Sequence, residues 1–338
     1  MNFKMWIKAL RVIPRITKEE WDQLDVVSRW LIATRGAVLI ITFIPAVMAG
    51  LLAAKDGMFH WLNWILLTVG LVFAHAMNNL LNDLSDYRRG VDKDNYFRTQ
   101  YGPQPLESGL MTTKQLLTYA AFNGVIALIC GLGLTLLIGW PILILIAIGA
   151  FFVFFYTWPL KYIGLGEVAV ILVWGPLMVG GGYYAITGVW SWTVCLASLT
   201  YALGAALVIF GKHIDKLPED KAKRIHTLPV IIGEKASRYA VLAMMAFQYI
   251  FVVYLVVTGY FSPILLIVFL ALFYIKPVVQ IFLHPKPVEC PADFPKDIWP
   301  LWFVAAGFEH NRKFGMFLML GLILQLPFFT NLVSSVFK

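Results

Sequence analysis

Carboxylate and amide side chains gather in two short stretches of this 338-residue chain, each at the end of an apolar run. The first stretch is HAMNNLLNDLSDYRRGVD, residues 75–92. Spacings of four, three and four residues place four of its polar side chains on one face of a helix: His75, Asn79, Asn82 and Asp86. Asp83 lies one turn from Asn79, and Asp92 follows Gly90, which is expected to end the helix. The stretch therefore predicts a row of oxygen ligands.

The second stretch is GKHIDKLPEDKAKRIHTLPVIIG, residues 211–233. Lys212, Asp215 and Glu219 share one helical face. Three more charged residues follow directly: Asp220, Lys221 and Arg224. Pro218 is expected to break or kink the helix at this point.

Charged residues at helix ends often only cap the helix, and we adopt this interpretation for Asp94, Glu234 and Lys235. It does not suffice for the two clusters, because several carboxylates near membrane depth are costly unless a cation compensates them. Oxygen ligands without cysteine favour Mg²⁺. The predicted ligands are Asn82, Asp83, Asp86, Asp92, Asp215, Glu219 and Asp220. Five of these are the candidate catalytic residues: Asn82, Asp86, Asp215, Glu219 and Asp220.

The composition places these clusters in a membrane protein. The chain is 60% hydrophobic and 14% charged, with a mean hydropathy of +0.76. Nine apolar runs are long enough to cross a hydrocarbon core of about 30 Å: 30–54, 60–82, 115–138, 140–158, 165–187, 190–212, 238–259, 262–283 and 314–336. We predict an N-terminal interfacial segment, 1–29, before an all-α transmembrane domain, 30–338. Residues 297–313 are also expected to form a helix in the interface.

Lys and Arg residues sort onto one side of the nine predicted spans, with only Lys55 and Lys338 on the other. This asymmetry predicts a cytoplasmic N-terminus, with both acidic clusters at the cytoplasmic face. The net charge of +8 is explained by orientation and by attraction to anionic lipid, so no nucleic-acid partner is implied.

The two clusters are 133 residues apart, from Asn82 to Asp215, and each follows the second span of a four-span set. We therefore predict two four-helix pseudo-repeats plus a ninth helix around a central cavity, with the clusters facing each other. An apolar cavity capped by Mg²⁺ and basic residues suits a lipid with a diphosphate head, such as a polyprenyl diphosphate. The stretch FFVFFYTWPLK, 151–161, is a candidate aromatic lining, in which Tyr156 and Lys161 stand out.

These motifs resemble those of the UbiA superfamily of intramembrane prenyltransferases, and most closely its MenA type. NNLLNDLSDYRRGVD is similar to the pattern NxxNDxxDxxxGxD, YTWPLKYIGLGE to a PLKYxGLGE segment, and GPLMVGGGYYAITG to a GPxxVxGTYY helix. YGPQPLESGLMT is similar to the loop that follows the first motif, and Arg35 falls where the family carries an early Arg.

The resemblance implies Mg²⁺-dependent transfer of a polyprenyl group from its diphosphate to an aromatic acceptor, with 1,4-dihydroxy-2-naphthoate favoured. The substrate-binding residues expected from the clusters and the resemblance are Arg35, Asn79, Arg88, Arg89, Tyr156, Lys161, Lys212, Lys221 and Arg224. The second motif departs from the family pattern, so the partner of Asp215 is either Glu219 or Asp220. The length of the segment 284–313 is unexplained.

Two other functions are open. The acceptor could be 4-hydroxybenzoate, homogentisate, chlorophyllide or a glycerophosphate. A secondary transporter would also explain repeats and buried carboxylates, but its carboxylates would be expected near the bilayer midplane. In this sequence they gather towards one face, which favours the enzyme.

Overall fold

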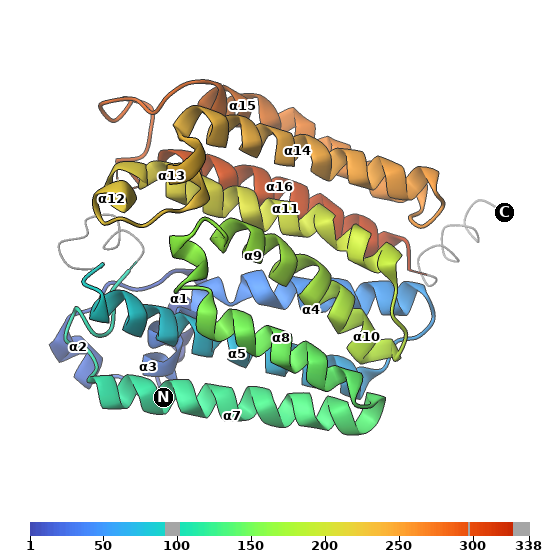
Figure 1. The fold of residues 1–338 in the computed structure, drawn as a ribbon, viewed down its shortest axis with the longest axis horizontal. Helices are drawn as coiled ribbons and strands as arrows, with labels where there is room; N and C mark the ends of the chain where they lie inside the picture. Colours follow the sequence, from blue (N-terminus) through green and yellow to red (C-terminus); the bar gives the residue numbers. More distant parts are fainter. Residues whose placement is uncertain (92–101, 297, 327–338) are drawn as a thin grey trace. The chain divides into compact units, whose positions relative to one another are not determined.

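The computed structural model describes residues 1–91, 102–296 and 298–326, and over these ranges every regular element is a helix (Figure 1). The chain divides into two compact units. Unit 1 comprises residues 1–44 and 65–159, and unit 2 comprises residues 45–64 and 160–338. The division after residue 159 agrees with the predicted boundary between the fourth and fifth spans, whereas the assignment of residues 45–64 to unit 2 was not expected.

Unit 1 begins with three short helices: α1 (Phe3–Arg11), α2 (Lys18–Asp22) and α3 (Val26–Ala33). Asp25 caps α3 by accepting hydrogen bonds from the backbone N–H groups of Val27 and Ser28, both at 3.1 Å. Desolvation would raise the pKa of Asp25, but hydrogen bonds from Ser28, Trp6 and Asn2 hold it well below its usual range. The predicted segment 1–29 is thus a set of capped helices.

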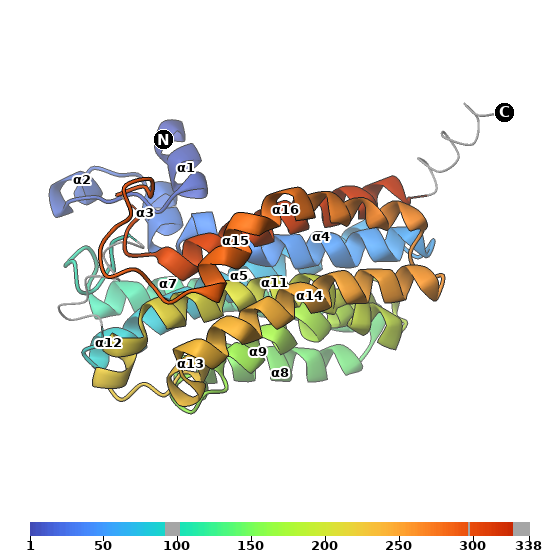
Figure 2. The ribbon, with the colours of Figure 1, turned by 90° about the horizontal axis from the view of Figure 1, so that it is seen from above.

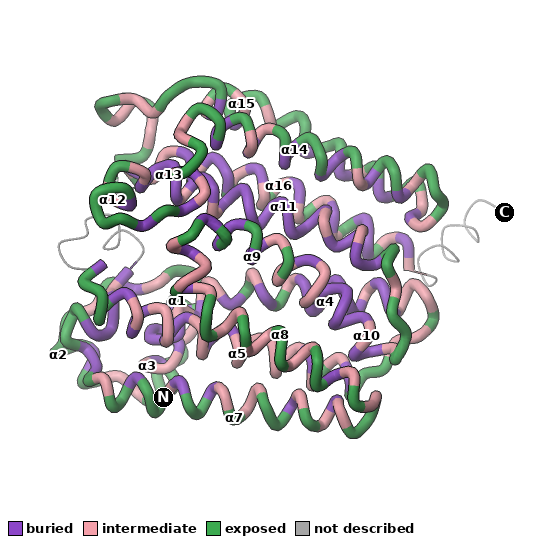
Figure 3. Tube along the Cα trace, viewed as in Figure 1, coloured by how far each residue is buried: buried purple, intermediate pink, exposed green. Residues whose placement is uncertain are grey.

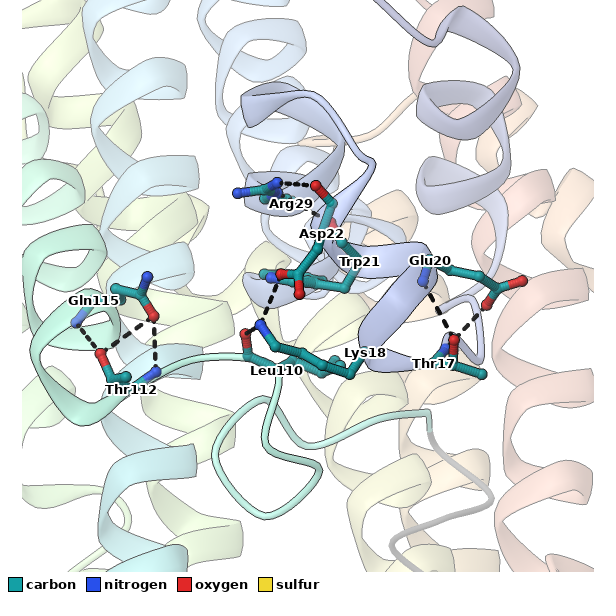
Figure 4. A network of polar contacts seen from close by, with 9 residues as sticks. All are labelled: Thr17, Lys18, Glu20, Trp21, Asp22, Arg29, Leu110, Thr112 and Gln115. Atoms are coloured by element: carbon teal, nitrogen blue, oxygen red, sulfur yellow. Dashed lines mark hydrogen bonds and ion pairs between the residues drawn. The ribbon is translucent and has the colours of Figure 1, made fainter.

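Figure 4 shows how this segment is tied to the rest of unit 1. Lys18 pairs with Asp22 at 2.7 Å and donates to the carbonyl oxygen of Leu110 at 3.3 Å. Arg29 donates to the carbonyl oxygens of Trp21 and Asp22. The N-terminal helices therefore pack on the loop that follows the first acidic cluster.

The first predicted span, 30–54, is not one helix. Arg35 adopts a left-handed conformation, with φ of 58°, and separates α3 from a short 3-10 helix, η1 (Gly36–Val38). The membrane-length helix begins only at Gly36 and continues through α4 (Ile40–Lys55). The hydropathy pattern could not reveal this break, because Arg35 lies beside uninterrupted apolar residues.

The remaining helices of unit 1 are long. They are α5 (Trp61–Arg88), α7 (Thr113–Ile138) and α8 (Pro141–Phe155). The helix α5 is longer than the predicted span 60–82, because it continues through the first acidic cluster to Arg88. Gly90 follows it with φ of 65°, as expected of the residue that ends a helix.

Unit 2 is built around α11, which packs against α14, α16 and η3 (Figures 1 and 2). Its helices are η2 (Leu160–Tyr162), α9 (Gly166–Leu172), η3 (Val173–Gly180), α10 (Gly181–Thr187), α11 (Trp192–Asp215), α12 (Leu217–Ala222), α13 (Leu228–Ile232), α14 (Glu234–Val257), η4 (Pro263–Tyr274), α15 (Ile275–Leu283) and α16 (Trp302–Leu324). Figure 3 shows α11 as largely buried, whereas α7 in unit 1 is mostly exposed or half-buried. Most of the exposed residues of α7 are apolar, as expected of a lipid-facing helix.

Seven helices of the described part of the chain are long and apolar enough to cross a membrane, which supports an integral membrane protein. The predicted span 140–158 is the shorter α8, of 15 residues. The predicted interfacial helix 297–313 and the ninth span, 314–336, differ from the structure. A single helix, α16, begins at Trp302 and carries Glu309, Arg312 and Lys313, and residues 327–336 lie outside the described residues. The count of nine spans is therefore not confirmed.

Candidate active site

The first acidic cluster lies on the last turns of α5, where other segments of unit 1 hold its amide side chains. Asn79 donates from Nδ2 to the carbonyl oxygen of Thr34 at 2.9 Å. Asn82 accepts through Oδ1 from the hydroxyl of Thr157, also at 2.9 Å. Because each amide already has a fixed partner, the orientation of this face of α5 is set by the protein.

Asp83 is fully buried and forms an ion pair with Arg35. The helix α3 ends just before Arg35, whose backbone is left-handed, and the side chain of Arg35 reaches this carboxylate. Gln104 donates from Nε2 to the backbone carbonyl of Asp83 at 3.0 Å. Arg35, predicted to bind substrate, is thus placed beside a predicted metal ligand.

Asp86 is 6% exposed and lies one turn beyond Asn82 on α5. Arg88 and Arg89 are exposed at the end of the helix, and Arg89 lies over the ring of Trp158 at 4.8 Å. Tyr156 is half-buried at the end of α8. Asp92, the last predicted ligand of this cluster, lies outside the described residues.

In unit 2, α11 ends at Asp215 and α12 begins at Leu217 with Pro218 in its first turn, as the proline predicted. Both carboxylate oxygens of Asp215 accept hydrogen bonds from α16. Oδ1 lies 3.1 Å from the backbone N of Phe303, and Oδ2 lies 3.0 Å from that of Val304. Lys286 adds an ion pair at 3.2 Å. Asp215 is therefore held by protein groups on both sides.

Glu219 and Asp220 follow in the first turn of α12. Asp220 is 1% exposed, and its Oδ1 lies 3.4 Å from Lys216 Nζ. Among the described residues, Asp220 Oδ2 and Glu219 Oε2 are buried without a hydrogen-bond partner. Buried carboxylate oxygens of this kind need a donor or a cation. This part of α12 therefore fits Mg²⁺.

In the described part of the chain, no three His, Cys, Asp or Glu side chains form a group that could hold a metal by themselves. Mg²⁺ is often bound through one or two carboxylates together with water and substrate phosphates. A shell of this kind would be completed by the substrate. The assignment of the seven predicted ligands stays a prediction.

The basic residues predicted to bind substrate differ in exposure. Lys161 is buried in η2, Lys212 is half-buried on α11, and Lys221 and Arg224 are exposed around the end of α12. The aromatic stretch 151–161 is less enclosed than predicted, because several of its rings are exposed: Phe151, Phe154, Phe155 and Trp158. These rings are more typical of an aromatic belt than of a cavity lining.

Two features of unit 2 were missed from the sequence. Lys286, the partner of Asp215, lies in the segment whose length was unexplained. His213 and Glu167 form a buried pair, with Nδ1 and Oε1 2.5 Å apart, and Glu167 also accepts from the backbone N of Leu228 at 3.3 Å. The segment PLKYIGLGE contained Glu167, but spacing alone gave no sign of its partner.

The fold defines a class: over the described residues this is an all-helical integral membrane protein, with buried carboxylates at the ends of α5 and α11 and in the first turn of α12. Comparison with known proteins makes this more specific. Residues 42–308 match the model of the UbiA prenyltransferase family. The chain belongs to the UbiA prenyltransferase family, and the predicted enzyme class, prenyltransferase, is confirmed.

Three relatives illustrate the similarity. The 1,4-dihydroxy-2-naphthoate octaprenyltransferase of Bacillus subtilis (strain 168) is 26% identical over 302 residues, which cover 86% of this chain and 91% of that protein. A structure of digeranylgeranylglyceryl phosphate synthase gives a TM-score of 0.62 at 18% identity, covering 88% of this chain and 97% of that one. A UbiA homologue from Archaeoglobus fulgidus, bound to GPP and Mg²⁺, gives 0.53 at 15%, covering 87% and 99%. The predicted resemblance to the UbiA superfamily and its MenA type is confirmed.

Proposed function

We propose that this protein transfers a polyprenyl group from its diphosphate to an aromatic acceptor in a reaction that requires Mg²⁺, and that the acceptor is 1,4-dihydroxy-2-naphthoate, as in menaquinone biosynthesis. The match to the Bacillus subtilis enzyme over nearly the whole of both chains carries the choice of acceptor. The Archaeoglobus fulgidus homologue, bound to GPP and Mg²⁺, supports the metal and the prenyl diphosphate.

The reaction exchanges one bond for another. The allylic C–O bond breaks and its electron pair leaves with the diphosphate. The prenyl carbon then bonds to a ring carbon, which gives up its proton or carboxyl group and so restores aromaticity. Mg²⁺ would supply positive charge that offsets the charge developing on the leaving group.

The residues of the first cluster would bind and orient the diphosphate end of the donor. Asp86 and Asn82 would hold the cation, because Asn82 is already fixed by Thr157 and Asp86 is buried one turn further along α5. Arg88 and Arg89, exposed beyond them, would contact phosphate oxygens, for which a guanidinium group has suitable paired donors.

The residues of the second cluster would hold a cation through Asp220 and Glu219, which carry the buried oxygens that lack a partner among the described residues. Lys221 and Arg224, exposed at the end of α12, would contact further phosphate oxygens. The sorting of Lys and Arg residues supports a cytoplasmic N-terminus and an active site open to the cytoplasm.

The acceptor can be tested by presenting the protein, in lipid bilayers with Mg²⁺, with several prenyl diphosphates and aromatic acids in turn. Mass spectrometry of the products should show the largest kcat/KM for 1,4-dihydroxy-2-naphthoate. Faster transfer to 4-hydroxybenzoate, homogentisate, chlorophyllide or a glycerophosphate would reassign the acceptor while leaving prenyl transfer intact.

A further inference from the structure

The residues between α15 and α16 that the structure describes, 284–296 and 298–301, are called the segment 284–301 below, and a small set of polar contacts fixes this segment to the second acidic cluster. The side chain of Asp215 is completely buried. It contacts one residue near the start of this segment and two residues just after its end. Lys286 pairs with it near the start, and the backbone N–H groups of Phe303 and Val304 donate to it just after the end.

Asp215 acts here as the cap of α16. The first N–H groups of a helix have no partner within the helix, and the residue before α16, Leu301, supplies no side-chain cap. The carboxylate of Asp215 satisfies two of these groups from another helix, and its negative charge is favourable at a helix N-terminus. A metal at Asp215 would compete with these donors.

Lys286 closes the segment on itself. Its ammonium donates to the carbonyl oxygen of Pro300 at 2.5 Å and lies 5.3 Å from the ring centre of Trp299, in addition to its pair with Asp215. One turn before Asp215, a Cβ at Gly211 would lie 2.7 Å from the carbonyl oxygen of Phe303. The glycine therefore allows α16 to approach α11 closely where the cap forms.

Asp220 contrasts with Asp215 in the same unit. It is equally buried, but its one ion pair, with Lys216, is longer and leaves Oδ2 without a partner among the described residues. A cation at Asp220 would contact a buried oxygen that lacks a partner among the described residues. A cation at Asp215 would instead leave two buried N–H donors without an acceptor, and the free energy lost would exceed the net contribution of a typical hydrogen bond.

We propose that Asp215 is a positioning residue which, together with Lys286, holds the segment 284–301 and the N-terminus of α16 at the end of α11, and that Asp220 is the metal-binding carboxylate of the second cluster. This inference rests on the proposed function for the role of Asp220. It also explains why the segment is long, because the segment has to reach from the end of α15 to the N-terminus of α16, which Asp215 of α11 caps.

The position of the segment can be measured without any activity assay. Cys290 lies half-buried within it, whereas Cys130 and Cys195 are buried in apolar helices. A water-soluble maleimide should therefore report on Cys290, with Cys290→Ser as the blank. We expect Asp215→Asn and Lys286→Met each to raise the labelling rate about tenfold, as the loss of roughly 1.4 kcal/mol of local stability would. Asp220→Asn should leave the rate within about twofold of the unchanged protein.

Titration of Mg²⁺ in the transfer assay, with the same three variants, distinguishes metal binding by Asp220 from positioning by Asp215 and Lys286. Asp220→Asn should raise the Mg²⁺ concentration at half-maximal rate by about tenfold or more. Asp215→Asn and Lys286→Met should lower kcat but keep that concentration within about twofold. The double variant Asp215→Asn, Lys286→Met should recover part of the lost rate, because neither charge then remains in place after its ion-pair partner has been removed.

Two results would overturn the inference while leaving the proposed function standing. One is a Mg²⁺ requirement that rises as much in Asp215→Asn as in Asp220→Asn. The other is an unchanged Cys290 labelling rate in Lys286→Met, which tests the anchor even if Asp215→Asn does not fold. The proposed function itself would fail differently: the unchanged protein would then form no prenylated product, or would form it at the same rate under excess chelator.

Discussion

The two acidic clusters are similar in sequence but differ in how the protein occupies their carboxylates. Each contains a buried aspartate paired with a cation of its own unit: Asp83 with Arg35, and Asp215 with Lys286. In the first cluster, the neighbouring amides are fixed by Thr34 and Thr157. In the second, the paired aspartate also caps a helix, and the neighbouring Asp220 retains an oxygen that no described residue contacts. We therefore propose that an acidic motif of this kind contains both positioning residues and metal ligands, and that a buried protein partner marks the positioning residue.

The strongest test of this distinction removes the charge of one proposed ligand from each cluster. Asp86→Asn and Asp220→Asn should each lower kcat for prenyl transfer by about 10²–10³-fold, as expected for the loss of a group that stabilises developing charge. The exposed Glu19→Gln, on α2, is the matched control and should have no effect. A loss in one cluster only would show that the clusters do not share the reaction.

Removal of a cationic partner should affect stability more in the first cluster than in the second. Arg35→Met takes the paired guanidinium away from the fully buried Asp83 carboxylate and should lower the free energy of unfolding by about 3–5 kcal/mol. Lys286→Met should cost less, because Asp215 keeps two backbone donors. Thermal unfolding followed by tryptophan fluorescence measures both variants. Equal losses would show that the helix-capping contacts contribute little.

The close approach of α11 and α16 gives a third test, confined to unit 2. Gly211→Ala would place a Cβ 2.7 Å from the Phe303 carbonyl oxygen, and should cost about 1–3 kcal/mol of stability by forcing the helices apart. Gly315→Ala, within α16, has no heavy atom within 4 Å of the added Cβ. It should stabilise the protein by about 0.5–1 kcal/mol through helix propensity. Opposite shifts in unfolding temperature are expected, and shifts of the same sign would contradict the packing described.

The smallest expected effect concerns the N-terminal segment of unit 1. The pKa of Asp25 is lowered in the folded protein, so its contribution to stability is complete above its ordinary pKa, near 4. The contribution should begin to fall as the pH drops below about 4, and be lost only at the depressed folded pKa. Hydrogen exchange of the amides of Val27 and Ser28 follows the cap, and Asp25→Ala should show the unprotected rate at every pH. Protection that is lost near pH 6 would point to another group.

Much of the fold could be predicted because apolar length and acidic spacing are local signals. The ends of α7 and α11 and the role of Pro218 follow from residues within one or two turns. The break at Arg35 could not be predicted, because the apolar residues around it continue without interruption and give no sign of a left-handed backbone. The early start of α16 was obscured by Glu309, Arg312 and Lys313, which resemble an interfacial segment.

Which residues make up the candidate site stays a prediction, and the contacts of those residues could not be predicted. Spacing identifies Asp215, Glu219 and Asp220 as one group, yet it carries no information on Lys286 or on the backbone of Phe303. Those contacts arise from tertiary packing around Gly211, and only the folded chain separates an anchored carboxylate from one that can accept a cation. That the two clusters face each other stays a prediction.

The most direct test of the account is a measurement of diphosphate release alongside prenylated product, from a polyprenyl diphosphate and 1,4-dihydroxy-2-naphthoate in lipid bilayers. Mg²⁺-dependent prenyl transfer should release one diphosphate for each product molecule in the presence of Mg²⁺, give no product after chelation, and recover fully when Mg²⁺ is restored. Product formation that continues unchanged under excess chelator would contradict it.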